Sequence, residues 1–559
     1  MLTLTVVMCF FSLSHGQYNT LRIPDTIAGT VFNLNVRDTF HQFLPGNQTI
    51  TGGINTDFWG PTLFMRKGDT VHMNVHSYLN DSTTMHWHGM HLPAVMDGGP
   101  HQIIPPGTVW QPYWLVTNQA STLWYHPHLH MTTEEQIAKG IGGFIIIRDS
   151  EEATLPIPRT YGVDDVPLVL TSRRFDASND FVIGTDPYGD TMIVNGTLHP
   201  QFTFPKQFIR LRILNAELER DYNLGFSDNR TFYLIGNDGG LLNAPVALTR
   251  LKMVPGERNE ILVNLSGDAI GSSLDLRAYN AGMEFGFGGS EPGTTAPFGS
   301  LLNNRNFDIL HIVVGAATSS AITTLPSSLI SNTYYTAADA TVSRTLLVTD
   351  GNPGGAPFRF DSRSYVESYI NYNVGLGATE KWTVINNNVF GHSFHIHDIQ
   401  FKMISRSSGG LASYEQGWKD TYYLKVNDTV TFVTRFTDYA DASHPFMYHC
   451  HIAPHEDAGM MGQFVVTDRT AVTDPEVKAP EYNVYPNPAQ NLLYAFPKDP
   501  TVKAYYATIT ALNGRTVMML PRPEMLKGID ISNIAPGTYM LNITDDASRL
   551  ISRISFIKQ

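Results

Sequence analysis

Residues 449–460 read His449-Cys450-His451-Ile452-Ala453-Pro454-His455-Glu456-Asp457-Ala458-Gly459-Met460. Because side chains alternate between the two faces of a strand, Cys450 points one way while His449 and His451 both point the other. A thiolate combined with imidazole and thioether donors is the ligand set of a blue-copper electron-transfer site. The two flanking histidines are therefore expected to serve a second metal site, back to back with the first.

Three further segments hold histidines at similar spacing. They are His86-Trp87-His88-Gly89, Trp124-Tyr125-His126-Pro127-His128 and Gly391-His392-Ser393-Phe394-His395-Ile396-His397. A single His-x-His pair is weak evidence, since imidazole suits copper and zinc alike and a lone pair is more often structural. The four segments together hold ten of the 20 histidines, enough for an eight-histidine group beside the two histidines of a Cys450 site.

The four segments resemble the metal-binding motifs of the multicopper oxidases, the family of laccases, bilirubin oxidases, spore-coat oxidases and bacterial cuprous oxidases. The resemblance covers roughly residues 20–470 and is strongest to the cuprous-oxidase and spore-coat branch. It includes three motifs without ligands: Asp97-Gly98-Gly99-Pro100, Pro255-Gly256-Glu257-Arg258 and Gly417-Trp418-Lys419-Asp420. Ser393 stands where the family usually has proline, and Asp398 where it usually has glycine or an aliphatic residue, which affects the expected loop geometry but no ligand.

The resemblance implies four copper ions in two sites. It assigns His392, Cys450 and His455 to a type 1 copper, with Met460 as the axial ligand. It assigns His86 and His395 to a type 2 copper, and His88, His126, His128, His397, His449 and His451 to a type 3 pair. The type 2 and type 3 ions together form the trinuclear cluster at which dioxygen would be reduced.

Three acidic residues are candidate catalytic groups, because dioxygen reduction consumes protons. Glu456 directly follows His455, and Asp97 lies in the loop after the first motif, at positions where the family places proton-relay or cluster-tuning acids. Asp420 is a candidate near the type 1 site, on the side of the donor. For Glu456 and Asp97, the alternative is a solvated surface carboxylate.

Short alternating runs separated by Gly, Pro and Asn turns predict an all-β chain of Greek-key sandwiches. Residues 70–75 and 208–214 are examples of strands with one polar face. We expect cupredoxin-like domains at 17–152, 153–315 and 344–470, with a Ser/Thr/Ala-rich linker at 316–343 and the metal cluster shared by the first and third. A two-domain copper nitrite reductase arranges its sites differently and fits poorly.

The two ends of the chain indicate export. Residues 1–16 contain an apolar run followed by small residues and are expected to be a signal peptide, although no basic start precedes the run and a buried strand is the alternative. This leader contains Cys9, the only cysteine besides Cys450. After a linker at 471–481, residues 482–559 predict a small β-sandwich that resembles the type IX secretion sorting domain, the alternative being a carbohydrate-binding or spacer module.

The amino-acid composition restricts the possible binding partners of the protein. The net charge of −13 argues against nucleic acid or an anionic membrane as a partner, and no apolar run is long enough to span a bilayer. We expect a secreted or cell-surface monomer that passes through the periplasm, engages the secretion machinery through its tail, and uses dioxygen.

The donor is the least determined feature of the chain. The 19 methionines are scattered, with none between Asp350 and Phe390, whereas cuprous oxidases carry a methionine-rich segment over the type 1 site. This favours a laccase-like enzyme that oxidises phenolic or other aromatic donors. Cuprous oxidation for copper tolerance is the first alternative, and a non-enzymatic copper-binding scaffold the second.

Overall fold

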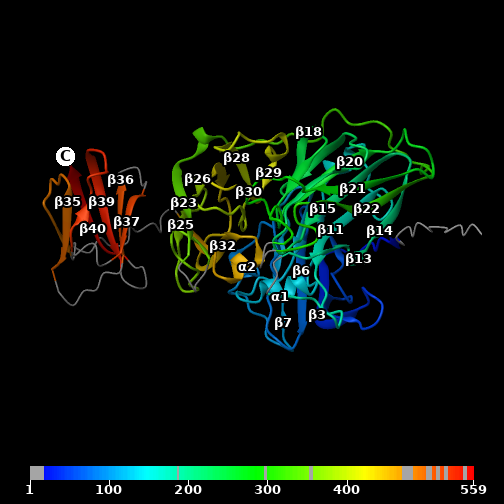
Figure 1. The fold of residues 1–559 in the computed structure, drawn as a ribbon, viewed down its shortest axis with the longest axis horizontal. Helices are drawn as coiled ribbons and strands as arrows, with labels where there is room; N and C mark the ends of the chain where they lie inside the picture. Colours follow the sequence, from blue (N-terminus) through cyan, green and yellow to red (C-terminus); the bar gives the residue numbers. More distant parts are fainter. Residues whose placement is uncertain are drawn as a thin grey trace, which may run out of the picture.

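The computed structural model describes residues 18–184, 188–294, 299–351, 357–468, 482–498, 506–511, 516–521, 527–544 and 550–559. The expected signal peptide (1–16) and the expected linker at 471–481 lie outside the described residues. The described chain is almost entirely β-structure, as predicted. Figure 1 shows the sheets of residues 18–468 packed into one body, with the strands of the C-terminal segment forming a separate small unit.

The first sandwich surrounds a core that includes Leu34, Val75, Trp87 and Ile145. One sheet consists of β4 (Thr49–Ile54), β3 (Val31–His41), β6 (Thr70–Tyr78), β7 (Val109–Trp110) and β8 (Tyr113–Leu115). The other consists of β2 (Thr26–Ala28), β5 (Thr62–Arg66), β10 (Gly143–Arg148) and β9 (Ser121–Tyr125). Exposed and buried residues alternate along β6, which confirms the polar face predicted for residues 70–75.

The second sandwich has a seven-stranded and a six-stranded sheet. The first contains β13 (Thr197–Leu198), β12 (Thr191–Val194), β11 (Asp165–Arg173), β15 (Phe208–Asn215), β20 (Arg258–Asn264), β17 (Phe232–Asn237) and β18 (Gly240–Leu248). The second contains β1 (Asn19–Thr20), β14 (Pro200–Pro205), β22 (Asn306–Gly315), β21 (Ser273–Tyr279), β16 (Tyr222–Phe226) and β19 (Leu251–Met253). β1 therefore pairs within the second sandwich, although it lies in the segment expected for the first.

The polar residues of β15 are not solvent-facing. Every residue of the strand is buried. Arg210 is ion-paired with Glu152 and Glu260, and Arg212 with Asp165 and Glu260. Buried charged side chains are tolerated when they are paired and hydrogen-bonded. The alternation in this strand therefore reflects a buried layer of ion pairs rather than a solvent-exposed face.

The third sandwich carries the Cys450 motif. Its six-stranded sheet contains β24 (Phe358–Phe360), β23 (Val342–Asp350), β26 (Thr379–Asn386), β31 (Thr429–Arg435), β28 (Phe401–Arg406) and β29 (Trp418–Lys419). Its five-stranded sheet contains β25 (Tyr372–Gly375), β33 (Met461–Thr467), β32 (Asp441–Cys450), β27 (His392–Ile396) and β30 (Thr421–Leu424). The expected linker before it is not a free tether, because Leu329 is buried against the core of the second sandwich.

Short helices lie where the first and third sandwiches meet. α1 (Thr133–Ala138) contacts α2 (Ala453–Asp457), and the 3-10 turn η1 (Ala94–Met96) contacts β32. The other 3-10 turns are η2 (Glu152–Thr154), η3 (Ala337–Asp339) and η4 (Ser413–Glu415). No helix within the described ranges is long and apolar enough to cross a bilayer.

The C-terminal segment has its own core, built around Leu493, Ile509 and Leu541. One sheet contains β34 (Tyr482–Tyr485), β35 (Leu492–Pro497) and β38 (Ile529–Asp530). The other contains β37 (Thr516–Pro521), β36 (Tyr506–Ala511), β39 (Gly537–Thr544) and β40 (Leu550–Lys558). This confirms the small C-terminal sandwich.

Candidate metal centre

The cysteine site lies at the end of β32. The sulfur of Cys450 is 3.6 Å from the Nδ1 atoms of both His392 and His455, and all three residues are buried. Burial raises the pKa of the Cys450 thiol to about 12. The Cys450 thiolate is therefore unfavourable in this apolar site unless a cation lies beside it. A metal ion bound to the sulfur would be such a cation.

A tight turn brings His455 back to Cys450. Pro454 lies in the first turn of the five-residue helix α2, where its missing N–H costs nothing. The helix ends in a Schellman motif: Gly459, at φ +93°, donates to the carbonyl of Glu456, and Met460 donates to the carbonyl of His455.

The same turn positions Met460. Its carbonyl accepts a hydrogen bond from the Cys450 N–H (3.1 Å), and its side chain is fully buried in the same core as Cys450. Met461 lies directly opposite His449 in the β32–β33 pairing. Because directly opposed residues share a face and successive residues alternate, Met460 rather than Met461 lies on the Cys450 side.

On the opposite face of β32, three histidines from three motifs converge. The Nε2 of His128 lies 3.1 Å from the Nε2 atoms of both His397 and His449. Each ring has its Nδ1 beside a carboxylate: Asp97 at 2.7 Å from His397, and Glu456 at 3.1 Å from His128 and from His449. With each Nδ1 beside an oxygen acceptor, the three Nε2 atoms point toward one another, an arrangement that suits a bound cation.

The remaining five cluster histidines are equally buried. The Nδ1 of His88 lies 3.4 Å from the Nε2 of His126, and the ring of His451 is 5.0 Å from that of His88. His86 and His395 have their Nδ1 atoms 2.9 Å from the carbonyls of Asp97 and Asp420. Among the residues that the structure describes, the Nε2 atoms of His86, His395 and His451 have no hydrogen-bond partner.

These orphaned imidazole nitrogens fit copper chemistry well. Neutral imidazole is a good copper ligand, and a ligating histidine normally donates its other nitrogen to a carboxylate or carbonyl. The geometry groups all eight predicted cluster histidines but does not divide them: His86 lies within ligand distance of His88 and His126, and also of His395 and His397. Their partition into type 2 and type 3 ligands stays a prediction.

Glycines make the close approaches possible. A Cβ on Gly98, at φ +78°, would lie 1.8 Å from the carbonyl oxygen of Met85. This turn directs Asp97 back toward His86 and His397. Gly89, at φ +87°, has no room for a Cβ between Arg258, Leu123 and Asp420.

The three predicted acids are all buried, so none is a solvated surface carboxylate. Burial alone would raise the pKa of Glu456, but the imidazoles of His128 and His449 hold it below its usual range. Asp420 was expected beside the type 1 site, and this placement is wrong. Its carboxylate lies 3.2 Å from the Nε2 of His88, so Asp420 belongs to the cluster side.

The pairing of β27 with β30 explains this difference. His392 pairs with Leu424 and His395 with Thr421, which places Asp420 at the cluster end of the strand pair. The Cys450 site instead has Asn388, whose side-chain amide lies within 3.3 Å of the outer nitrogen of His392. No feature of the sequence singled out Asn388.

Two motifs that carry no predicted ligand meet each other. Arg258 donates two hydrogen bonds to Asp420 (2.7 and 2.5 Å), and Lys419 is ion-paired with Glu257 (2.7 Å) and Asp238 (3.0 Å). All five are buried. The second sandwich thus holds Asp420 in place behind the imidazoles of His88 and His395.

Two family models match the body of the chain: "Multicopper oxidase" models cover residues 35–152 and 337–470. A multicopper oxidase of Staphylococcus haemolyticus is 30% identical over 438 residues, spanning 76% of this chain and 86% of that one. The chain belongs to the multicopper oxidase family. A "Secretion system C-terminal sorting domain" model matches residues 483–558.

Other relatives of this multicopper oxidase chain differ in their named roles. The cell division protein FtsP of Xenorhabdus nematophila is 32% identical over 426 residues, spanning 75% of this chain and 86% of its own. A solved structure of a laccase-like multicopper oxidase from Ochrobactrum sp., with activity toward lignin model compounds, is 30% identical with a TM-score of 0.71; the match covers 80% of this chain and all of that one.

Proposed function

We propose that the protein oxidises small aromatic donors one electron at a time and reduces dioxygen to two waters, consuming four electrons and four protons. His392, Cys450, His455 and Met460 would hold one copper, and the eight cluster histidines the other three. Bound copper would supply the one-electron redox chemistry and the site of dioxygen reduction, which the side chains alone cannot provide.

One observation carries this proposal: the position of Cys450 between two cluster histidines. Its sulfur faces His392 and His455, whereas His449 and His451, joined to it by peptide bonds, point into the cluster. The two sites are therefore connected through a short covalent path. A protein that only sequesters metal would have no need for such a link.

The buried acids have roles that follow from their contacts. Glu456 lies against His128 and His449, and Asp97 against His86 and His397. Both fix the rings with their Nε2 lone pairs turned inward. As carboxylates beside a site that consumes protons, they are also placed to pass protons to dioxygen-derived oxygen atoms.

Exposed apolar residues in the segments around His392 support an aromatic donor. Gly391, which precedes His392, donates to the carbonyl of Gly286 (3.1 Å). Phe285, which precedes Gly286, is 67% exposed, and Val389, two residues before Gly391, is 57% exposed. Exposed apolar side chains in these two segments suit a flat apolar donor better than a hydrated metal ion, so cuprous oxidation remains the second activity.

The naming of relatives as cell division proteins raises the non-enzymatic alternative. The complete donor set, with every predicted imidazole buried and turned inward, favours the oxidase. Copper-loaded full-length protein should be blue and consume oxygen with a methoxyphenol, with a higher kcat/KM than for chelated cuprous ion. A colourless protein, or a blue protein without oxygen uptake, would favour the scaffold, and a clear preference for cuprous ion would favour copper detoxification.

The sorting domain supports a location outside the cytoplasm. We infer that residues 1–16 direct the chain to the periplasm and that residues 482–559 engage the secretion machinery, giving a secreted or cell-surface oxidase. Fractionation of the producing cells tests this: retention of the full-length protein in the cytoplasm would contradict it.

A further inference from the structure

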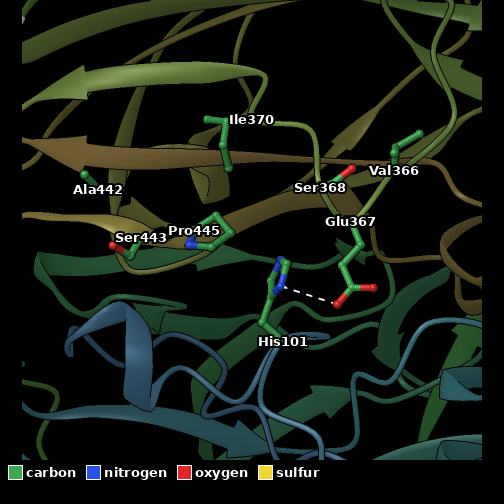
Figure 2. A pocket seen from close by; sticks show the side chains of 8 residues that line it. All are labelled: His101, Val366, Glu367, Ser368, Ile370, Ala442, Ser443 and Pro445. Atoms are coloured by element: carbon green, nitrogen blue, oxygen red, sulfur yellow. Dashed lines mark ion pairs between the residues drawn. The ribbon is translucent and has the colours of Figure 1, made fainter. Parts of the chain in front are cut away.

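A hollow follows the seam between the first and third sandwiches. A pocket of about 590 Å³ is lined by residues that include His101, Glu367, Ser443 and Pro445, and Figure 2 shows His101 pointing across it toward Glu367. A second pocket of about 270 Å³ shares Glu367 and reaches Leu129, the residue after His128. The two pockets therefore adjoin at Glu367, and the second is lined by the residue next to a cluster histidine.

The hydrogen bonds of Gln463 fix the protonation of His101. The side-chain nitrogen of Gln463 donates to the carbonyls of Glu367 and Tyr369, both at 2.8 Å. Its side-chain oxygen therefore faces the Nε2 of His101 at 2.7 Å and must accept from it. A proton therefore lies on Nε2, and the Nδ1 of His101 faces Glu367, 3.7 Å from its Oε1.

This separation distinguishes the pair from other histidine–carboxylate pairs outside the two metal sites. In four such pairs the Nδ1–oxygen distance is 2.7 Å, the length of a shared proton: His41–Asp57, His91–Asp398, His311–Asp275 and His444–Asp441. At 3.7 Å, the Nδ1 of His101 and the Oε1 of Glu367 are within ion-pair range but too far apart for a hydrogen bond. Two metal–ligand bonds of about 2.0–2.2 Å each can span this gap.

We propose that His101 and Glu367 bind a further copper ion in this pocket, separate from the two buried sites. An imidazole with a carboxylate suits cupric ion, which binds nitrogen and oxygen donors more tightly than the other divalent first-row metals. The pocket is open, so water completes the coordination and the ion exchanges readily. This site also captures copper and supplies it to the histidine cluster, a role that rests on the proposed function.

The position of the loop supports this supply role. Residues 97–101 run from Asp97, which contacts cluster histidines His86 and His397, to His101 in the pocket. Leu129 and His130, directly after His128, line the adjoining pocket. An ion held by His101 would lie at one end of this loop, and Asp97 lies beside the cluster at its other end.

Copper counting tests the site. Full-length protein with its buried sites filled is dialysed against cupric ion and compared with His101→Gln, Glu367→Gln and the matched control His444→Gln. We expect the wild type and the control to bind one exchangeable copper more than the two variants, with an additional paramagnetic signal, while all four stay equally blue. Equal copper counts in all four proteins, or the same loss in His444→Gln, would overturn the proposal.

Copper uptake by the metal-free protein tests the supply role. At limiting copper, His101→Gln and Glu367→Gln should fill the cluster several-fold more slowly than the wild type or His444→Gln, and reach the same final occupancy. Equal rates would overturn the supply role. A wild type that fills neither buried site would instead contradict the proposed function itself, so the two failures are distinguishable.

Discussion

Replacing Arg258 by Met should impair the histidine cluster and leave the Cys450 site intact. Arg258 is fully buried and donates both of its terminal nitrogens to Asp420, with further bonds to the carbonyls of Thr122 and Gly256. Its removal leaves the Asp420 carboxylate buried and unpaired beside His88. Breaking a buried pair in this way costs about 3–5 kcal/mol, and losing a partner that orients a ligand weakens metal binding by roughly 10–100-fold.

The expected result is a protein that keeps its blue colour and loses cluster copper. The unfolding transition should fall by roughly 6–20 °C, taking about 2–4 °C per kcal/mol for a domain of this size. Copper content, blue absorbance and calorimetry measure the three quantities on one sample.

Arg406→Met is the matched control for this prediction. Arg406 is equally buried and ion-paired with Glu415 and Asp428, but it contacts none of the predicted copper ligands. It should destabilise the protein similarly and leave the cluster filled. If Arg406→Met loses cluster copper to the same extent, or if Arg258→Met bleaches the blue site first, the positioning argument for Arg258 and Asp420 is refuted.

Four further outcomes are expected. Cys450→Ser should lose blue absorbance and oxygen uptake together, and phenol oxidation near the wild-type rate would contradict the electron path. Met460→Leu should stay blue with a higher reduction potential in redox titration, because a weak axial donor to oxidised copper is lost; an unchanged or lower potential would exclude Met460. Protein truncated before residue 482 should keep full oxygen uptake once purified, unless the tail is part of the oxidase. Burial would lower the pKa of His91, but Asp398 and Asp438 raise it to about 9. His91→Gln should therefore cost up to about 3 kcal/mol near pH 6, while both carboxylates are ionised, and should lose this electrostatic cost above pH 10, as read from unfolding midpoints.

The faces on which the motif side chains lie could be predicted because they depend only on local spacing. Alternation along one strand was enough to place Cys450 on one face and His449 and His451 on the other, and the structure has this arrangement. The position of Asp420 could not be predicted in the same way. It depends on the register between β27 and β30, which are separated by two strands of the other sheet.

The burial of charged side chains could not be predicted from the sequence pattern either. The alternation in residues 208–214 indicates a strand equally well whether the polar face meets water or a layer of carboxylates. Arg210 and Arg212 are buried because Glu152, Asp165 and Glu260 arrive from distant segments. The same holds for Arg258, whose partner Asp420 is 162 residues away.

The two departures from the family pattern connect the cluster strand to the other sandwiches. The Ser393 hydroxyl donates to the carbonyl of Pro255 in the second sandwich (2.6 Å), and Asp398 is ion-paired with His91 in the first (2.7 Å). Both residues lie next to predicted ligands, His392 and His397. In this chain, therefore, contacts that dock the sandwiches also hold the predicted metal ligands in place.

This arrangement makes metal binding and domain docking one equilibrium. The first sandwich supplies four cluster histidines and the third supplies the other four, so neither can bind the predicted ions alone. Metal bound at such a shared site stabilises the docked state and not the separated one. Without metal, the inward-facing Nε2 atoms of His128, His397 and His449 would oppose docking, and the contacts at Ser393, Asp398 and Asp420 would offset that repulsion.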